Sequence, residues 1–489
     1  MRSLFIAVLK TGSGAVVNLL LGVVSIKIMA VMLGPSGTGL FSLIRQAITT
    51  LSSLGFGGQT ALVQGAANKQ GKRRDSYLRT TFWLFAGGGL LSAMLIELFA
   101  PRLCTLVFGS ADARTIQLIR LFALPVILLH AHIYLKSVIN GCRAIGRLAL
   151  VEILGPLITL LATYPVCVFV GEGYALAFVW MLSAAYAVMI IASGLILYKN
   201  GWIPSLFMGA EGLVQSADFH YFISIAGITF LTGMISSGTL LAVRTMVARD
   251  GGLHQAGLFD LAWSLSGSYV MLLLSSFGTY YTPTLSQAVD STERAALVRR
   301  VIRLSTMLMI PMIVTMIVIK PLLVKALYSN EYIASLELVR WMLIGDYLKI
   351  TSWVLATAVV VNLDMKIYFW TETFWYVGFL ALSALAIFYF RDLQGIGVAF
   401  IGLYAALVYY YLQYVRRVYK MKLSSDLLIP WLIGLATVLI ASIQNWYSTA
   451  ADWFSSLLWI AGSTTLTLMF LKQSERRMIW DKIWFKLRN

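Results

Sequence analysis

The sequence predicts an all-α polytopic membrane protein with about fourteen transmembrane helices. Its layout is two pseudo-symmetric six-helix bundles around a central cleft, followed by two extra C-terminal helices. Hydrophobic residues make up 59% of the 489 residues and charged residues only 12%, with a mean hydropathy of +0.81, whereas soluble chains carry about 25% charged residues. Apolar runs long enough to cross a bilayer recur along the chain. The stretch 27–64 is also echoed by 240–287.

Fourteen apolar runs qualify as membrane spans by their length. They lie near 12–33, 38–64, 80–100, 117–141, 148–170, 174–198, 220–247, 255–283, 303–324, 334–362, 367–389, 394–415, 427–446 and 452–471. A chain so rich in spans is excluded from the soluble globular class.

The connections between the spans alternate in charge. Every second connection is basic (69–79, 143–147, 294–303 and 416–422), whereas those between them are short and nearly uncharged. The positive-inside rule makes the basic connections cytoplasmic, and it predicts that both termini are cytoplasmic. We therefore interpret the net charge of +17 as a topology signal. Its expected partners are anionic lipids at the cytoplasmic face, and nucleic acid is not expected.

An internal duplication organises the chain. Gly39-Leu40-Phe41 returns as Gly257-Leu258-Phe259, and Lys27 is echoed by Arg244. Residues that match at a constant offset of 220 are Pro101 and Pro321, Arg120 and Arg340, and Glu152 and Glu372. A proline, an arginine and a glutamate in one register are not explained by shared apolar composition.

The duplication predicts four regions. They are an N-terminal six-helix bundle at 1–199, a cytoplasmic linker at 200–219, a second six-helix bundle at 220–420, and two additional transmembrane helices with an amphipathic cytoplasmic tail at 421–489. An even number of spans brings both halves into the membrane the same way round. The two halves should then be related by an axis along the membrane normal.

Basic side chains inside the apolar runs are the main candidate functional residues. A charge at mid-membrane costs ~2.5–3.5 kcal/mol even on the lenient insertion scale, so each requires a reason. An excess of cations around a central cleft favours an anionic ligand, and arginine suits phosphate because its planar fork donates two parallel hydrogen bonds. The residues assigned to substrate binding in a cationic cavity are Lys27, Arg45, Arg244 and Lys136.

A second set of charged residues is assigned to ion coupling or internal ion pairing, two alternatives that the sequence leaves open. The set is Asp260, Asp346, Lys349, Glu152 and Glu372. Asp346 and Lys349 are three residues apart and share a helical face. Arg120 and Arg340 are expected to snorkel toward the membrane surface and to serve the structure. His130 and His132 are candidate proton carriers.

No metal centre and no cofactor are predicted. The three cysteines fall in unrelated segments without metal-ligand spacing, and two histidines two residues apart do not share a helical face. Coupling to an H+ or Na+ gradient remains open.

At this point a family resemblance can be named. The run from Lys27 through Leu33-Gly34-Pro35 to Arg45, the segment 343–349 and the six-plus-six layout resemble the Wzx-type lipid-linked oligosaccharide flippases. These bacterial proteins move O-antigen and enterobacterial common antigen units, and belong to the multidrug/oligosaccharidyl-lipid/polysaccharide exporter superfamily. The resemblance covers about residues 1–420. The two further spans are typical of the lipid II flippase branch and of some capsule exporters.

The resemblance implies a V-shaped pair of bundles in the bacterial inner membrane. Its substrate would be an undecaprenyl-diphosphate-linked glycan, moved from the cytoplasmic to the periplasmic leaflet. The family's cationic lumen would correspond to Lys27, Arg45 and Arg244. Polysaccharide polymerase machinery is a further partner that it suggests.

Two other functions compete with a flippase. A cation-coupled multidrug exporter of the same superfamily would need a more acidic or aromatic cavity than the buried lysines and arginines predict. A membrane enzyme of polysaccharide assembly would present acid/base residues in a substantial outer loop, and the outer connections here are mostly a few residues long. We therefore expect a transporter and not an enzyme.

Overall fold

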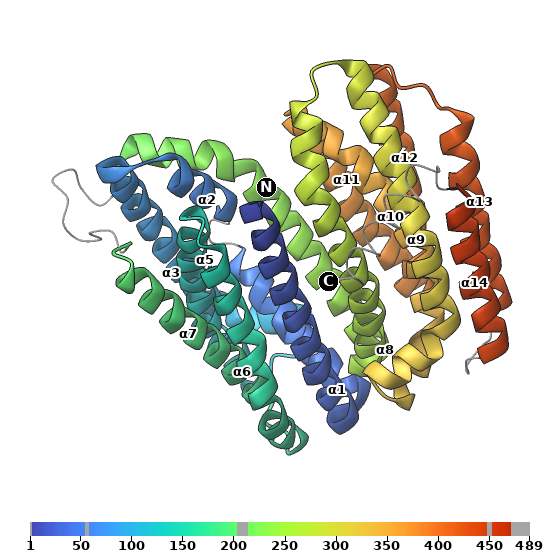
Figure 1. The fold of residues 1–489 in the computed structure, drawn as a ribbon. Helices are drawn as coiled ribbons and strands as arrows, with labels where there is room; N and C mark the ends of the chain where they lie inside the picture. The colour runs from blue at the N-terminus through green and yellow to red at the C-terminus, as the bar shows by residue number, and fades with distance from the viewer. Residues whose placement is uncertain (1, 54–57, 203–213, 447–451, 471–489) are drawn as a thin grey trace. The chain divides into compact units, whose positions relative to one another are not determined.

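The computed structural model describes residues 2–53, 58–202, 214–446 and 452–470, and the regular elements within these residues are all helical (Figure 1). The first seven helices are α1 (Arg2–Ser52), α2 (Gln59–Asn68), α3 (Gly71–Phe108), α4 (Ala113–Leu121), α5 (Ala123–Gly141), α6 (Ile145–Gly171) and α7 (Leu176–Lys199). The later elements are α8 (Ser216–Gln287), α9 (Ser291–Leu327), the 3₁₀ segment η1 (Asn330–Ser335), α10 (Leu336–Val361), α11 (Met365–Ala384), the π segment η2 (Leu385–Tyr389), α12 (Gln394–Val418), α13 (Ser425–Gln444) and α14 (Trp453–Phe470).

The polytopic all-α class is confirmed. Among the described residues, twelve helical stretches are long and apolar enough to cross a membrane. Two of them, in α1 and α8, are each interrupted by a kink, at Gly34 and at Gly252. The two arms of each kinked helix correspond to two of the predicted spans, which is how fourteen predicted spans appear as twelve stretches.

The kinks are local consequences of the sequence. Gly34 has a φ of 61° and Gly252 a φ of 75°, a left-handed conformation that glycine adopts without the steric cost of a Cβ atom. Pro35 follows the first kink, and proline has no N–H to donate into the preceding turn. The hairpin turns of both repeats are therefore single glycines between two helical arms.

One predicted span ends earlier than expected. The second arm of α1 stops at Ser52 instead of continuing to residue 64, and α2 begins at Gln59. The hydroxyl of Ser52 donates to the Thr49 carbonyl at 2.7 Å, and that of Ser53 donates to the Thr50 carbonyl at 2.6 Å. Serine hydroxyls that bond to the backbone in this way weaken helix continuation, and hydropathy does not register this effect.

Contacts divide the chain into two compact units. The first contains residues 1–260 and 327–329, and the second contains residues 261–326 and 330–489. The first unit therefore includes the first arm of α8. The units are defined by contacts between residues, whereas the predicted regions are defined by the internal duplication of the sequence. The predicted region limits stay a prediction. Residues 203–213 of the linker and the tail at 471–489 lie outside the described residues.

Within the first unit, the repeated glycines Gly39 and Gly257 lie at a close contact between α1 and α8. A Cβ atom added to Gly39 would lie less than 3.0 Å from the Leu253 carbonyl oxygen, and one added to Gly257 would lie less than 3.0 Å from the Pro35 carbonyl oxygen. The second arm of α1 thus crosses α8 just beyond its kink, backbone against backbone. Glycine recurs in both repeats because the crossing leaves no room for a side chain at either position.

In the second unit, two buried cations hold the end of α13. Lys320 of α9 donates to the Asn445 carbonyl at 2.9 Å, and Arg340 of α10 donates to the Trp446 carbonyl at 3.1 Å. The Arg340 guanidinium also lies 3.6 Å from the centroid of the Trp446 ring. Both cations face the carbonyl end of a helix, where positive charge is favourable. The snorkelling predicted for Arg340 is wrong, because its side chain is completely buried.

Candidate functional site

The first unit places an ion pair across the kink of α8. Arg244 precedes Gly252 and Asp260 follows it, and the Arg244 Nη1 donates to Asp260 Oδ1 at 2.6 Å. Both side chains are buried, with Arg244 4% and Asp260 7% exposed. The Nε–H of Arg244 is buried and makes no hydrogen bond within the described residues. Asp260 therefore neutralises the guanidinium through Nη1, while the Nε–H donor is unused.

Arg45 lies near this pair on the second arm of α1. Its neighbours Ile44 and Ala47 are completely buried in the first unit, whereas Arg45 is only partly buried. Its guanidinium lies 5.4 Å from the Phe41 ring centroid, and its charge acts on both Arg244 and Tyr186. Within the described residues, Arg45 forms neither a hydrogen bond nor an ion pair through its side chain. The charges of the two arginines therefore interact, and Asp260 pairs with Arg244.

Lys27 lies on the first arm of α1 and is held by the backbone. Its ammonium donates to the carbonyl of Tyr328, in the short segment 327–329 that groups with the first unit. The predicted role of Lys27 in substrate binding stays a prediction.

Lys136 lies in a different cluster. Its Nζ is 3.3 Å from Glu152 Oε1, and His132 Nε2 is 3.8 Å from the same oxygen. The His132 ring also stacks on Tyr186, with centroids 6.4 Å apart and planes 23° apart. The sequence placed Lys136 and Glu152 in different categories, and the structure brings them together with a histidine.

The second unit buries Asp346 among hydroxyl donors. Ser266 donates to Asp346 Oδ1 at 2.8 Å and Tyr269 donates to Oδ2 at 2.7 Å. The Lys349 ammonium is 3.8 Å from Oδ1, so the two residues pair as their spacing predicts. Lys349 also lies 5.6 Å from the Phe400 ring centroid. The role of Asp346 and Lys349 in ion coupling stays a prediction.

Glu372 has a different environment from its sequence counterpart Glu152. It is partly buried in α11, and its charge acts on Tyr368, Tyr404 and Tyr411. In the part of the chain that the structure describes, no basic side chain pairs with it. The sequence echo therefore preserves the carboxylate but not its partners.

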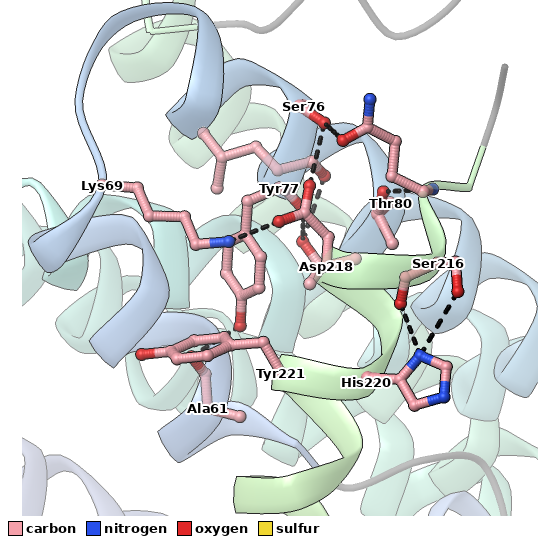
Figure 2. Close-up of polar contacts among 12 residues, drawn as sticks. Ala61, Lys69, Ser76, Tyr77, Thr80, Ser216, Asp218, His220 and Tyr221 are labelled. Carbon is pink, nitrogen blue, oxygen red and sulfur yellow. Dashed lines mark hydrogen bonds and ion pairs between the residues drawn. The ribbon is translucent and has the colours of Figure 1, made fainter. Parts of the chain in front are cut away.

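One polar cluster was not singled out by the sequence (Figure 2). Lys69, at the end of α2, forms an ion pair with Asp218, in the first turn of α8. The Lys69 ammonium lies 4.5 Å from the Tyr77 ring centroid and 4.8 Å from that of Tyr221, and Ser76 donates to the Asp218 carboxylate at 2.8 Å. Lys69 was interpreted as one of several cytoplasmic basic residues. The signal in the sequence that could have identified this cluster is Asp218, an acidic residue at the start of the second repeat.

This cluster should stabilise the first unit. Asp218→Ala leaves the Lys69 ammonium beside two rings without its carboxylate, and removing one partner of a buried pair costs about 3–5 kcal/mol. Because the Lys69 side chain is 24% exposed, we expect a smaller loss of about 1–3 kcal/mol. Thermal unfolding of the purified protein, followed by tryptophan fluorescence, measures the loss. The matched control is Asp75→Ala, an exposed acid beside Ser76. Equal melting of the two variants would contradict the assignment.

With this geometry in view, the chain can be compared with known proteins. The family model described as "Polysaccharide biosynthesis protein" matches residues 28–337, most of the chain. The chain belongs to this family. The matched residues of this polysaccharide biosynthesis protein include Arg45, Arg244 and Asp260.

A curated relative has a named activity. The lipid III flippase of Escherichia coli (strain K12) is 29% identical to this chain over 384 residues, which is 76% of this chain and 88% of that protein. A lipid III flippase of Shigella flexneri matches to the same extent. Both relatives are named as flippases.

Solved structures share the fold. A lipid II flippase, MurJ, in an inward closed conformation has a TM-score of 0.71 at 14% identity, covering 97% of this chain and all of that one. A multidrug resistance MATE family transporter in an inward-facing conformation has a TM-score of 0.66 at 11% identity, covering 84% and 96%. These likenesses show that the chain shares the fold of these two transporters.

Proposed function

We propose that this polysaccharide biosynthesis protein is a flippase for a polyprenyl-diphosphate-linked oligosaccharide. It moves its substrate from the cytoplasmic to the periplasmic leaflet by alternating access. The lipid III flippase relatives and the fold shared with a lipid II flippase support this function. The glycan chain varies between such lipids, whereas the diphosphate is common to them, so the protein's cations would recognise the shared part.

Arg45 is the observation that carries the proposal. It is a partly buried guanidinium in an apolar helix, without a carboxylate partner among the described residues, and its charge acts on a second arginine. Two arginines close together repel each other unless an anion lies between them. Asp260 compensates Arg244, so a diphosphate that approached Arg45 would complete the neutralisation.

The hydrogen-bonding capacity of Arg244 also suits a diphosphate. Its Nη1 is engaged by Asp260 while its buried Nε–H is unused. Leaving a buried donor unsatisfied costs about 1–3 kcal/mol. A phosphate oxygen that accepted from this group would recover that cost. In this proposal Arg45 and Arg244 bind the diphosphate, while Lys27 and Lys136 add charge.

The orientation of the protein in the membrane follows from the charge of the connections. The basic connections face the cytoplasm in this proposal, which places both termini there and brings anionic lipid headgroups against them. The polymerase machinery would receive the glycan at the opposite leaflet. An H+ or Na+ gradient would bias the direction.

The alternative is a cation-coupled multidrug exporter, which the MATE likeness permits as a fold. Its binding residues would have to attract cationic drugs. The polar groups around Arg45 and Arg244 carry an excess of positive charge, which disfavours that ligand.

Reconstituted vesicles test the function. A fluorescent polyprenyl-diphosphate oligosaccharide is distributed over both leaflets, and a membrane-impermeant hydrolase then cleaves the accessible pool. Protein-free vesicles should lose only the outer-leaflet substrate, and vesicles with the protein should lose all of it. An unchanged inner pool, together with exchange of a cationic dye, would favour the exporter instead.

A further inference from the structure

The cluster of His132, Lys136 and Glu152 in the first unit contains two bases and one acid. The Glu152 Oε1 atom lies between the two bases, 3.3 Å from the Lys136 ammonium and 3.8 Å from His132 Nε2. Three helices contribute, because His132 and Lys136 belong to α5, Glu152 to α6 and the stacked Tyr186 to α7. Both bases approach the same carboxylate oxygen, so they compete for it.

His132 is buried with unused hydrogen-bonding capacity. Its residue is 4% exposed, and its Nδ1 makes no hydrogen bond within the described part of the chain. Its Nε2 is still beyond hydrogen-bond range of Glu152. The charged groups that act on the ring are Lys136 and Glu152, and the charge of Arg45 acts on the stacked Tyr186. A protonated His132 would therefore have the Glu152 carboxylate as its neighbouring anion.

We propose that, when His132 takes up a proton, Glu152 pairs with His132 instead of with Lys136. The released Lys136 then binds the diphosphate. With neutral His132, Glu152 neutralises Lys136, and these two residues form the closer pair in the structure. With protonated His132, an imidazolium–carboxylate pair forms and the Lys136 ammonium becomes available. The inference rests on the proposed function and adds to it the ligand that regulates the site, which is a proton.

Charge balance couples the proton to the substrate. Lys136 and Glu152 sum to zero, so protonation of His132 adds one positive charge to a buried cluster adjoining Arg45. That addition is unfavourable in the empty protein and is compensated when an anionic diphosphate is bound. Binding of the proton and binding of the diphosphate therefore favour each other, and by linkage the effect is reciprocal. The sign follows directly: the diphosphate binds more tightly as the pH falls through the titration of His132.

Binding of decaprenyl diphosphate to the purified full-length protein tests the switch. Affinity is measured by thermophoresis at about pH 5 and about pH 8, because burial moves the titration of a histidine below its ordinary pKa of about 6.5. The probe itself titrates in this range, but equally for every variant. The compared quantity is thus the ratio of the two affinities, relative to the control His130→Gln. His130 lies on the same helix and is equally buried, and its ring bonds to the Val126 carbonyl.

The variants give distinct results. His132→Gln should bind weakly at both pH values, because Lys136 stays on Glu152, so its ratio should fall at least about fivefold below that of His130→Gln. Glu152→Gln should bind the diphosphate tightly at both pH values, because Lys136 then has no carboxylate partner and is available at either pH. Glu152→Gln also tests the switch if the His132 variant does not fold.

Two results would overturn the inference. If the wild type binds the diphosphate but His132→Gln keeps the ratio of His130→Gln, the switch is refuted and the proposed function stands. The same holds if Glu152→Gln retains the wild-type ratio. If the wild type does not bind the diphosphate at either pH, the proposed function fails and the switch fails with it.

Discussion

Arg45→Ala should reduce export of the lipid-linked glycan by roughly tenfold or more while the amount of folded protein in the membrane stays unchanged. Arg45 has no carboxylate partner in the described residues, so its removal leaves no buried charge behind. Hydrogen bonds to charged groups contribute about 1.5–3 kcal/mol, so the loss of one should slow transport by roughly tenfold or more. Arg45→Lys should recover part of the activity, because lysine keeps the charge but not the planar fork. Vesicle transport and membrane protein levels are measured together.

Arg244→Ala supplies the contrast. Removing Arg244 leaves Asp260 buried without its partner, which costs about 3–5 kcal/mol, so both export and protein level should fall. Adding Asp260→Ala should restore the level but not the export. Arg120→Ala is the control, since Arg120 is half exposed and lies 3.5 Å from Glu97. Normal export by Arg45→Ala would remove the main support for diphosphate binding at this position.

Gly257→Ala should reduce export by roughly tenfold or more, although it adds only one methyl group. The new Cβ atom would meet the Pro35 backbone at the crossing of α1 and α8, and backbone cannot rotate away as a side chain can. Overpacking of this kind costs about 1–3 kcal/mol. During alternating access the protein must pass through each of its conformations. Destabilising the conformation in which α1 crosses α8 therefore slows transport.

Cysteine labelling shows whether the crossing has opened. Thr38 is 4% exposed in the crossed structure, and a cysteine at that position, with the three native cysteines replaced, should react with maleimide faster in Gly257→Ala. Gly238→Ala is the matched control on the same helix, since a Cβ there meets nothing within 4 Å. The crossing would have no role in transport if the two variants exported equally.

Local features of the sequence predicted most of the fold. The spans follow from hydropathy, and the hairpin turns follow from Gly34 and its counterpart Gly252. The pairing of Asp346 with Lys349 also follows from spacing along one helix. Each of these is decided within a few residues, where length, periodicity and turn chemistry are sufficient.

Partners distant in the chain could not be predicted. Ser266 and Tyr269 reach Asp346 from about eighty residues away, and no pattern in the sequence connects them. Lys136 was predicted to face the cavity, but whether it meets Glu152 depends on how α5 and α6 rotate against each other. Hydropathy fixes that a helix is buried, whereas the face it turns toward a neighbour is decided by packing.

The two cations that hold the end of α13 have a consequence for biosynthesis. The Trp446 carbonyl is 106 residues downstream of Arg340, and the Asn445 carbonyl is 125 residues downstream of Lys320. At about 5–20 residues per second, the ribosome supplies the Trp446 carbonyl roughly 5–20 seconds after Arg340. During that interval α9 and α10 carry charges whose carbonyl partners do not yet exist. Their stable integration therefore depends on α13, so the last helices complete the insertion of earlier ones.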